Sequence, residues 1–253
     1  MNAKIAIFQV TARMSATMLL LLNLLLCGVM SDAGAGAGAE PKGFWLRQSI
    51  NVPAMKQLGV ALFKPQLMVP RFQLASVKDL DVDSLYAMGA RYIVFDKDNT
   101  LAIPFQDEIE PSLQDKVGQL KAGPFAGKMA ILSNSAGSCD DDDFRLATAT
   151  EKGLGFPVIR HVYKKPKCLD EVLTHFGAHV SADQICVVGD RLLTDVMFGN
   201  MHGMVTVLVN PLSNRRDHIV AVAIRSVERF FLLPVARMLY ALLRAVGLAR
   251  TGV

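Results

Sequence analysis

The stretch YIVFDKDNT, residues 92–100, decides the fold of this 253-residue chain. Four apolar residues, enough for a short buried strand, are followed at once by two carboxylates and a threonine, and acids are poor strand formers. Asp96 and Asp98 are separated by one residue, so an extended backbone points both side chains the same way. Converging carboxylates repel one another unless a proton or a cation lies between them. Mg²⁺ prefers such oxygen ligands, although a polar loop or a helix cap is the alternative for this motif alone.

Short apolar runs of the same kind recur along the chain, with helical patterns between them. The runs cover residues 129–132, 158–159, 185–188 and 205–209, and the helical patterns lie around 113–120, 144–151, 167–176 and 192–199. β-Branched runs that alternate with helices predict βαβ units. We therefore expect an α/β fold over residues 91–213, with a Rossmann-like parallel sheet and helices on both faces. Ligands of such folds bind beyond the carboxyl ends of the strands.

Polar residues follow several of these runs, at the edge where a ligand would bind. Ser133 and Asn134 follow the run 129–132, and Asp190 and Asp195 follow the run 185–188. Lys165 stands in a lysine cluster before a helical pattern. Taken singly, these residues also suit a helix cap or a solvated surface. Taken together with Asp96 and Asp98, they suit phosphoryl transfer, in which carboxylates hold a cation and the cation, a lysine and a serine balance the phosphoryl charge.

The four motifs together resemble those of the haloacid dehalogenase (HAD) superfamily. They are DKDNT at 96–100, Ser133, Lys165-Pro166, and Gly189-Asp190 followed by Asp195. The longer stretches FDKDNTL, LSNSAGS, IRHVYKKP and VVGDRLLTDV resemble the mitochondrial phosphatidylglycerophosphate phosphatases of fungi and plants, over about residues 62–213. The resemblance implies a Mg²⁺-dependent phosphomonoesterase that converts phosphatidylglycerophosphate to phosphatidylglycerol in cardiolipin and phosphatidylglycerol biosynthesis.

The resemblance also assigns roles to the acidic residues. Asp96 would be the nucleophile that forms an aspartyl phosphate. Asp98 would protonate the leaving oxygen and then activate the hydrolytic water. Mg²⁺ would be held by Asp96, by the backbone carbonyl of Asp98 and by Asp190, and Asp195 would support this metal site directly or through water.

The remaining motif residues would handle the phosphate. The resemblance places Ser133 and Lys165 on the transferring phosphoryl group, with Asn134 as a further phosphate contact. Thr100 is expected to orient the first loop. The segments from Asp96 to Ser133 and from Ser133 to Lys165 each leave room for one helix and one strand, so we expect no sizeable cap domain and an open site. An open site suits a phosphate carried by something large, such as a lipid headgroup, a phosphoprotein or a nucleic-acid end.

The first 90 residues contain two segments outside the predicted core. In residues 1–40 no acid precedes Asp32, and the apolar run 18–30 has about 13 residues, fewer than the roughly 20 that span a bilayer. A signal-like or organelle-targeting segment, or a short membrane anchor, is expected here, followed by a flexible Gly/Ala linker. Residues 41–90 form an amphipathic lead-in.

Residues 214–253 form a basic tail with helical periodicity. It holds seven arginines but only Asp217 and Glu228 as acids. Its helices either pack on the core or lie on an anionic membrane surface as a peripheral contact. The excess of 27 basic over 23 acidic residues, a net charge of +4, is too small to predict a nucleic-acid partner. The sequence predicts no oligomeric state.

Three functions remain open on the sequence. The first is the lipid phosphatase, for which the resemblance implies the mitochondrial inner membrane on its matrix side, with a plastid as the alternative. The second is a capless HAD phosphatase that acts on soluble phosphomonoesters or phosphoproteins. The third is a non-catalytic, membrane-associated HAD-like binding module. That module would lack the nucleophile or a metal ligand, and neither is missing here.

Overall fold

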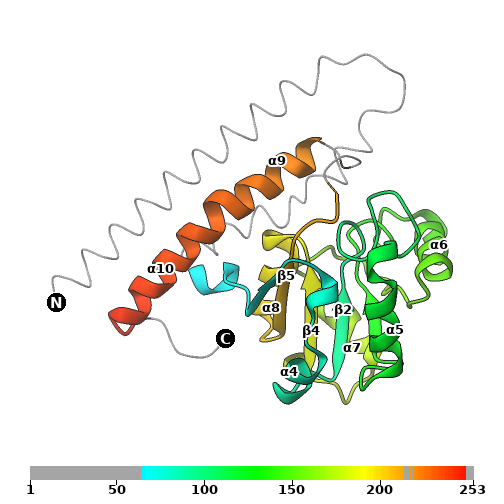
Figure 1. Ribbon diagram of the computed structural model, residues 1–253, viewed down its shortest axis with the longest axis horizontal. Coiled ribbons are helices and arrows are strands. Elements are labelled where there is room, and N and C mark those ends of the chain that lie inside the picture. Colours follow the sequence, from blue (N-terminus) through cyan, green and yellow to red (C-terminus); the bar gives the residue numbers. More distant parts are fainter. Residues whose placement is uncertain (1–63, 214–216, 218, 249–253) are drawn as a thin grey trace, which may run out of the picture.

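A five-stranded parallel sheet forms the centre of the molecule (Figure 1). The computed structural model describes residues 64–213, 217 and 219–248, so the targeting and linker segment predicted for 1–40, and residues 41–63 of the lead-in, lie outside it. The strand order is β1-β5-β4-β2-β3, and every neighbouring pair is parallel. The strands are β1 Phe72–Leu74, β2 Tyr92–Phe95, β3 Met129–Ile131, β4 Ile185–Gly189 and β5 Val205–Val209. The predicted α/β fold is confirmed.

Two details of the predicted sheet were wrong. The run 158–159 is no strand, because Val158 makes only an isolated bridge to Ile131. The preceding residue is Pro157, which has no N–H with which to extend a ladder. The fifth strand is instead β1, which belongs to the lead-in and pairs with β5 from Phe72 opposite Val207 onward. Three residues are too short a run to produce a period-two signal.

Helices cover both faces of the sheet because successive strand residues point to opposite sides. On one face, Ile93 and Phe95 pack with residues of α5 Gln114–Ala122 and α6 Arg145–Leu154. On the other face, Val94 packs with residues of α7 Leu169–Phe176 and α8 Met197–Met201. These elements match the four predicted helical patterns. The pattern at 192–199 is observed as a π-helical turn, η6 Leu192–Val196, that runs into α8.

Only short elements lie between the strands apart from these helices. They are η2 Val77–Asp79, α4 Val82–Ala87, η3 Pro111–Leu113, η4 Asp142–Phe144 and η5 Ala182–Gln184, and a further short element, η1 Pro65–Met68, precedes β1. Between β2 and β3 the chain forms only η3 and α5, and between β3 and β4 only η4, α6, α7 and η5. The described residues therefore contain no separate cap domain, as the motif spacing predicted.

The C-terminal part is one continuous helical rod that runs along the core (Figure 1). Its segments are α9 Ile219–Val227, the π-helical η7 Glu228–Leu232 and α10 Leu233–Ala245. Leu232, Leu233 and Ala236 are buried against residues of η1, η6 and α8. One face of the tail therefore packs on the core, which was one of the two alternatives. In the described ranges, no helix has both the length and the hydropathy to span a bilayer.

Candidate active site

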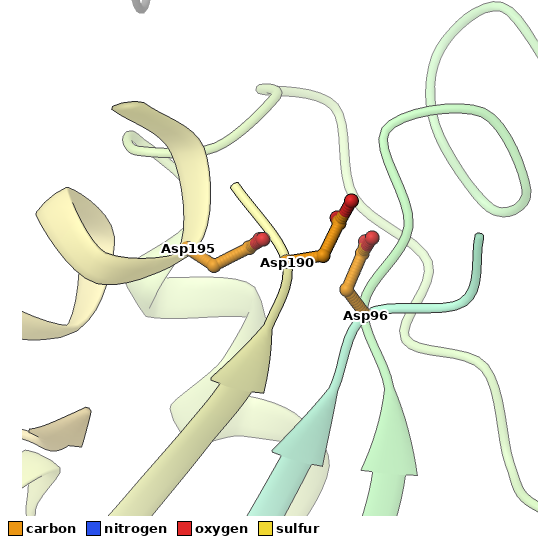
Figure 2. A group of neighbouring side chains, drawn as sticks. All are labelled: Asp96, Asp190 and Asp195. Carbon is orange, nitrogen blue, oxygen red and sulfur yellow. The ribbon is translucent and has the colours of Figure 1, made fainter. Parts of the chain in front are cut away.

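Three aspartates meet at the carboxyl edge of the sheet. Asp96 follows β2, Asp190 follows β4, and Asp195 reaches them from η6 (Figure 2). One carboxylate oxygen from each lies within 4.8 Å of the others. The adjacent strand ends are fixed by the backbone, because the Asp96 N–H donates to the carbonyl of Val188 at 2.8 Å. The topology thus brings together acids that are about a hundred positions apart in sequence.

Lys165 joins this cluster from the loop before α7. Its ammonium donates to Oδ1 of Asp96 at 2.7 Å and to Oδ1 of Asp195 at 2.5 Å, and its side chain is only 2% exposed. Burial would lower the pKa of Lys165, but the two carboxylates outweigh it and raise that pKa well above the ordinary value. The lysine is therefore a fixed positive charge between two acids.

The three carboxylates of the cluster face two cationic groups, the Lys165 ammonium and the Arg225 guanidinium, whose Nε lies 2.6 Å from Asp190. Burial, together with the charges of Asp195 and Asp190, raises the pKa of Asp96 to about 7, although Lys165 opposes this rise. Burial and the charge of Asp195 raise the pKa of Asp190 to about 6. Such clustered carboxylates bind a proton or a cation. The three oxygens are hard ligands and lie close enough to share one small divalent ion.

Asp195 is bound at both of its oxygens by the protein. Oδ1 accepts from Lys165, and Oδ2 accepts from the Arg191 N–H at 3.0 Å. The close approach requires glycine at 189, because a Cβ there would lie 2.2 Å from Oδ2 of Asp195. The geometry suits a residue that positions Lys165 and the loop after β4.

Asp98 stands apart from the three-aspartate cluster. Its side chain is 38% exposed and lines the same pocket as Asp96. Its Oδ1 is nevertheless buried and accepts no hydrogen bond in the described part of the chain. Burial raises the pKa of Asp98, against the opposing effects of Lys97 and of a hydrogen bond from the Phe105 N–H. A carboxyl that holds its proton to higher pH is suited to act as an acid.

Two of the three predicted phosphate-binding residues, Ser133 and Asn134, line this pocket, whereas the buried Lys165 contacts Asp96 and Asp195 and is not part of the pocket lining. Ser133 and Asn134 follow β3 beside Asp96 and Asp190. The buried Oγ of Ser133 lies 3.0 Å from Oγ of Ser135 and accepts from the Ser135 N–H at 3.2 Å. Oδ1 of Asn134 is buried and lacks a hydrogen-bond partner among the residues described. The pocket therefore contains polar groups that a ligand could engage.

The side chain that holds the first loop, residues 96–100, by hydrogen bonds is Asn99. The sequence predicts this role for Thr100 instead. The Thr100 hydroxyl is buried and bonds to nothing within the described ranges. Asn99 has a φ of 62°, a left-handed conformation that asparagine tolerates well. Its side chain accepts from the Ser213 N–H at 3.0 Å and donates to Oδ2 of Asp217 at 2.9 Å. Asn99 thereby ties the loop to the segment that leads into α9.

The C-terminal rod supplies site residues that the sequence analysis missed. Arg225 and Asp217 line the pocket, and Nε of Arg225 lies 2.6 Å from Oδ2 of Asp190. Nη2 of Arg225 donates to Asp217 at 2.7 Å. Arg229 donates from Nη2 to the Asp190 carbonyl at 3.0 Å. From the sequence, these arginines are predicted only to belong to a basic tail, because helical periodicity does not indicate which charges point inward.

Comparison with known proteins places this site in a family. The model of a family described as mitochondrial PGP phosphatase matches residues 52–213, more than half of the chain. The chain is 42% identical over 183 residues to the chloroplastic phosphatidylglycerophosphate phosphatase 1 of Chlamydomonas reinhardtii, covering 68% of this chain and 66% of that relative. It is 35% identical over 186 residues to the chloroplastic/mitochondrial phosphatidylglycerophosphate phosphatase 1 of Arabidopsis thaliana. This match covers 72% of this chain and 53% of that relative.

A fungal relative is also similar. The mitochondrial phosphatidylglycerophosphatase of Saccharomyces cerevisiae is 36% identical over 167 residues, which cover 60% of this chain and 85% of the relative. The chain thus spans less than two thirds of the algal and plant relatives but most of the yeast one. No solved structure matches the chain. On the family match, and with its motifs gathered at one sheet edge, this chain belongs to the mitochondrial PGP phosphatase family.

Proposed function

We propose that this protein hydrolyses the terminal phosphomonoester of phosphatidylglycerophosphate, which yields phosphatidylglycerol and phosphate on the route to cardiolipin. The observation that carries the proposal is the position of Asp96. Its carboxylate lies 2.7 Å from the Lys165 ammonium and within 4.8 Å of the Asp190 and Asp195 oxygens, in a pocket that Ser133 also lines. A carboxylate between a lysine and other acids can attack phosphorus while the neighbouring charges balance the phosphoryl group.

The reaction proceeds in two displacements. Lys165 holds Oδ1 of Asp96, which leaves Oδ2 to attack phosphorus. The bond from phosphorus to the glycerol oxygen breaks, and the proton of Asp98 passes to that oxygen. Water then attacks the aspartyl phosphate, Asp98 takes a proton from it, and inorganic phosphate leaves. Ser133, Asn134 and Lys165 bind the phosphoryl oxygens through both steps.

Mg²⁺ is the cofactor that we propose for this site. Asp96 and Asp190 would hold it, together with the backbone carbonyl of Asp98, and Asp195 would support the site through Lys165 and the Arg191 N–H. When bound, the ion supplies positive charge that offsets the phosphoryl oxygens and favours the ionised form of Asp96. The raised pKa values of Asp96 and Asp190 support this assignment, because burial and the neighbouring carboxylates disfavour the ionised forms and a bound cation would offset both effects.

The protein acts at an anionic membrane surface as a peripheral enzyme. The face of the rod directed away from the core carries Phe230, 76% exposed, and Phe231, 64% exposed, and continues with Met238 and Leu242. Exposed apolar residues on a basic helix suit the interface of an anionic bilayer. The relatives are named as mitochondrial or chloroplastic, and we place this protein at the mitochondrial inner membrane, facing the matrix, with a plastid as the alternative.

Phosphate release from phosphatidylglycerophosphate in phosphatidylcholine vesicles, with p-nitrophenyl phosphate as the soluble comparison, tests the function. Each substrate is assayed with Mg²⁺ and with EDTA. We expect Mg²⁺-dependent release and a higher kcat/KM for the lipid. An equal or higher kcat/KM for the soluble ester would favour the soluble phosphatase instead. Unchanged lipid hydrolysis by Asp96→Asn would mean that this site is not the catalyst.

The compartment is tested separately. The full chain, fused at its C-terminus to a fluorescent protein, is followed by microscopy against mitochondrial and plastid markers. Protease protection in isolated organelles then reports the side of the membrane. Co-localisation with mitochondria and protection until the inner membrane is opened are expected, and location at any other membrane would contradict the assignment.

A further inference from the structure

Arg225 contributes a guanidinium to the active-site pocket from outside the HAD core. It comes from α9, lines the pocket with Asp96 and Ser133, and is only 5% exposed. Two carboxylates hold it: Asp190 lies against Nε at 2.6 Å, and Asp217 accepts from Nη2 at 2.7 Å. The guanidinium is therefore fixed in place before any substrate arrives.

The third nitrogen of this guanidinium is not hydrogen-bonded by the described part of the chain. Nη1 of Arg225 is buried and makes no hydrogen bond within the described residues. A buried donor of a charged group left without a partner is costly, and such groups in native proteins are normally satisfied. Because Arg225 lines a pocket, an anionic ligand in that pocket can supply the missing acceptor. Arginine is well suited to this task because it presents its donors in a planar fork to phosphate oxygens.

We propose that Arg225 binds the second anionic group of the substrate, the phosphodiester that joins the glycerol headgroup to the lipid. The inference rests on the proposed function. The transferring phosphoryl group already has Lys165 and Ser133, whereas the diester phosphate, one glycerol away, needs a cation of its own. Arg225 is placed for it, because the rod that carries this side chain inward also presents Phe230 and Phe231 to solvent, where the lipid would lie. Arg225 is thus a specificity-determining residue for substrates with two phosphates.

Asp217 sets the strength of this contact. Asp217 and Asp190 both contact the Arg225 guanidinium, and the Asp217 carboxylate offsets part of the positive charge of Arg225. It also accepts from Asn99 through the same oxygen, Oδ2, at 2.9 Å. Replacing Asp217 by asparagine keeps a hydrogen-bond acceptor of the same shape and removes the negative charge. Neutralising Arg225 should therefore weaken binding of the diester phosphate, whereas neutralising Asp217 should strengthen it.

Two soluble substrates isolate this contact from membrane binding. Glycerophosphoglycerol phosphate, the deacylated headgroup, carries both phosphates, and glycerol 3-phosphate carries only the monoester. For each variant the measured quantity is the ratio of kcat/KM for the first over the second, in which any loss common to both substrates cancels. We expect the wild type to prefer the two-phosphate substrate. Arg225→Gln should lower the ratio by about tenfold to a hundredfold, the effect of losing a charge-assisted hydrogen bond to phosphate.

The other variants test whether Arg225 binds the diester phosphate or only supports the structure of the site. Arg225→Lys keeps the charge and should give an intermediate ratio, whereas Asp217→Asn should raise the ratio above the wild-type value. Arg145→Gln is the matched control, because this arginine is 80% exposed on α6 and its loss should leave the ratio unchanged. Thermal melting checks that each variant is folded. If Arg225→Gln does not fold, Asp217→Asn decides alone.

Several results would overturn the inference. They are a wild-type ratio near one, an unchanged ratio in Arg225→Gln despite a common loss of activity, and an unchanged or lowered ratio in Asp217→Asn. The second result would mean that Arg225 only positions Asp190. None of these results affects the vesicle assay of the wild type, in which failure to hydrolyse phosphatidylglycerophosphate would refute the proposed function itself.

Discussion

Glu228 of the C-terminal rod and Arg191 of the loop after β4 form a buried ion pair, with Oε1 and Nη2 3.0 Å apart. The same carboxylate accepts from the Leu192 N–H at 2.8 Å, and the Glu228 side chain is only 1% exposed. The rod is therefore attached to the loop that positions Asp190 and Asp195. Removing one member of such a pair leaves the other charge buried without a partner.

The first prediction is that Glu228→Ala destabilises the protein by about 3–5 kcal/mol, the usual effect of breaking a buried pair on one side. Urea denaturation followed by circular dichroism measures the free energy of unfolding. Glu108→Ala removes an exposed glutamate as the control and should cost about 0.5 kcal/mol or less. Equal stability of the Glu228 variant and the control would show that the pair does not hold the rod to the core.

The second prediction concerns Lys165. Lys165→Met should lower kcat by about 10²–10³-fold, because it removes a fixed positive charge beside the phosphoryl group. Lys167→Met, two positions away at an exposed site, is the control and should retain activity. Phosphate release from phosphatidylglycerophosphate vesicles measures both. A Lys165 variant as active as the control would mean that Lys165 does not bind the transferring group.

The third prediction tests Asp98 as the acid. Asp98→Asn should slow hydrolysis of glycerol 3-phosphate by about 10²–10⁴-fold, because the alkoxide leaving group needs a proton. Hydrolysis of p-nitrophenyl phosphate should fall less, since nitrophenolate leaves without one. Steady-state rates on the two esters give the comparison, and Glu108→Gln, at an exposed position of the same loop, should not alter their ratio. An equal loss on both esters in Asp98→Asn would argue against proton transfer by this residue.

The fourth prediction concerns pH and metal. The pKa values of Asp96, about 7, and Asp190, about 6, are raised above the ordinary value of an aspartate, 3.8. Between pH 5 and 7 these two carboxyls hold more protons in the folded, metal-free protein than in the unfolded chain, so their contribution to stability falls as pH rises through that range, by an amount on the order of several kcal/mol. Burial lowers the pKa values of His161 and His175, and these two groups therefore change stability with pH in the opposite direction. Mg²⁺ competes with these protons and should stabilise the protein more at pH 7.5 than at pH 5.

Urea denaturation at these pH values, with EDTA or with Mg²⁺, measures this dependence. Asp190→Asn removes one of the two carboxylates and should reduce both the pH dependence and the stabilisation by Mg²⁺. If metal-free Asp190→Asn and metal-free wild type showed the same change in stability between pH 5 and 7, the raised pKa described for Asp190 would be contradicted.

The fifth prediction concerns the outward face of the rod. The double change Phe230→Ser and Phe231→Ser should weaken binding to vesicles that contain anionic lipid by about tenfold or more, because two aromatic side chains no longer enter the interface. Co-sedimentation measures binding, and rates on glycerol 3-phosphate should stay near the wild-type value. Phe144→Ser, which changes an exposed phenylalanine beside α6, serves as the control. Wild-type vesicle binding by the double variant would place the membrane contact elsewhere.

The core of the fold could be predicted from the sequence because its strands are short apolar runs that end in polar residues. The run 92–95 before Asp96 and the run 185–188 before Asp190 place both acids at one edge once the strands are parallel. Strand β1 could not be predicted, since its three residues form a strand only through pairing with β5. The inward orientation of Arg225 could not be predicted either, because it depends on where Asp190 and Asp217 lie in space.

The match to the family model ends at residue 213, whereas Asp217 and Arg225 of the pocket wall come after it. The chemistry and the proposed recognition of the headgroup are therefore encoded in different stretches of the gene product. Two chains with identical motifs could differ in which phosphate esters they accept, through changes that a comparison confined to the motif region would not register.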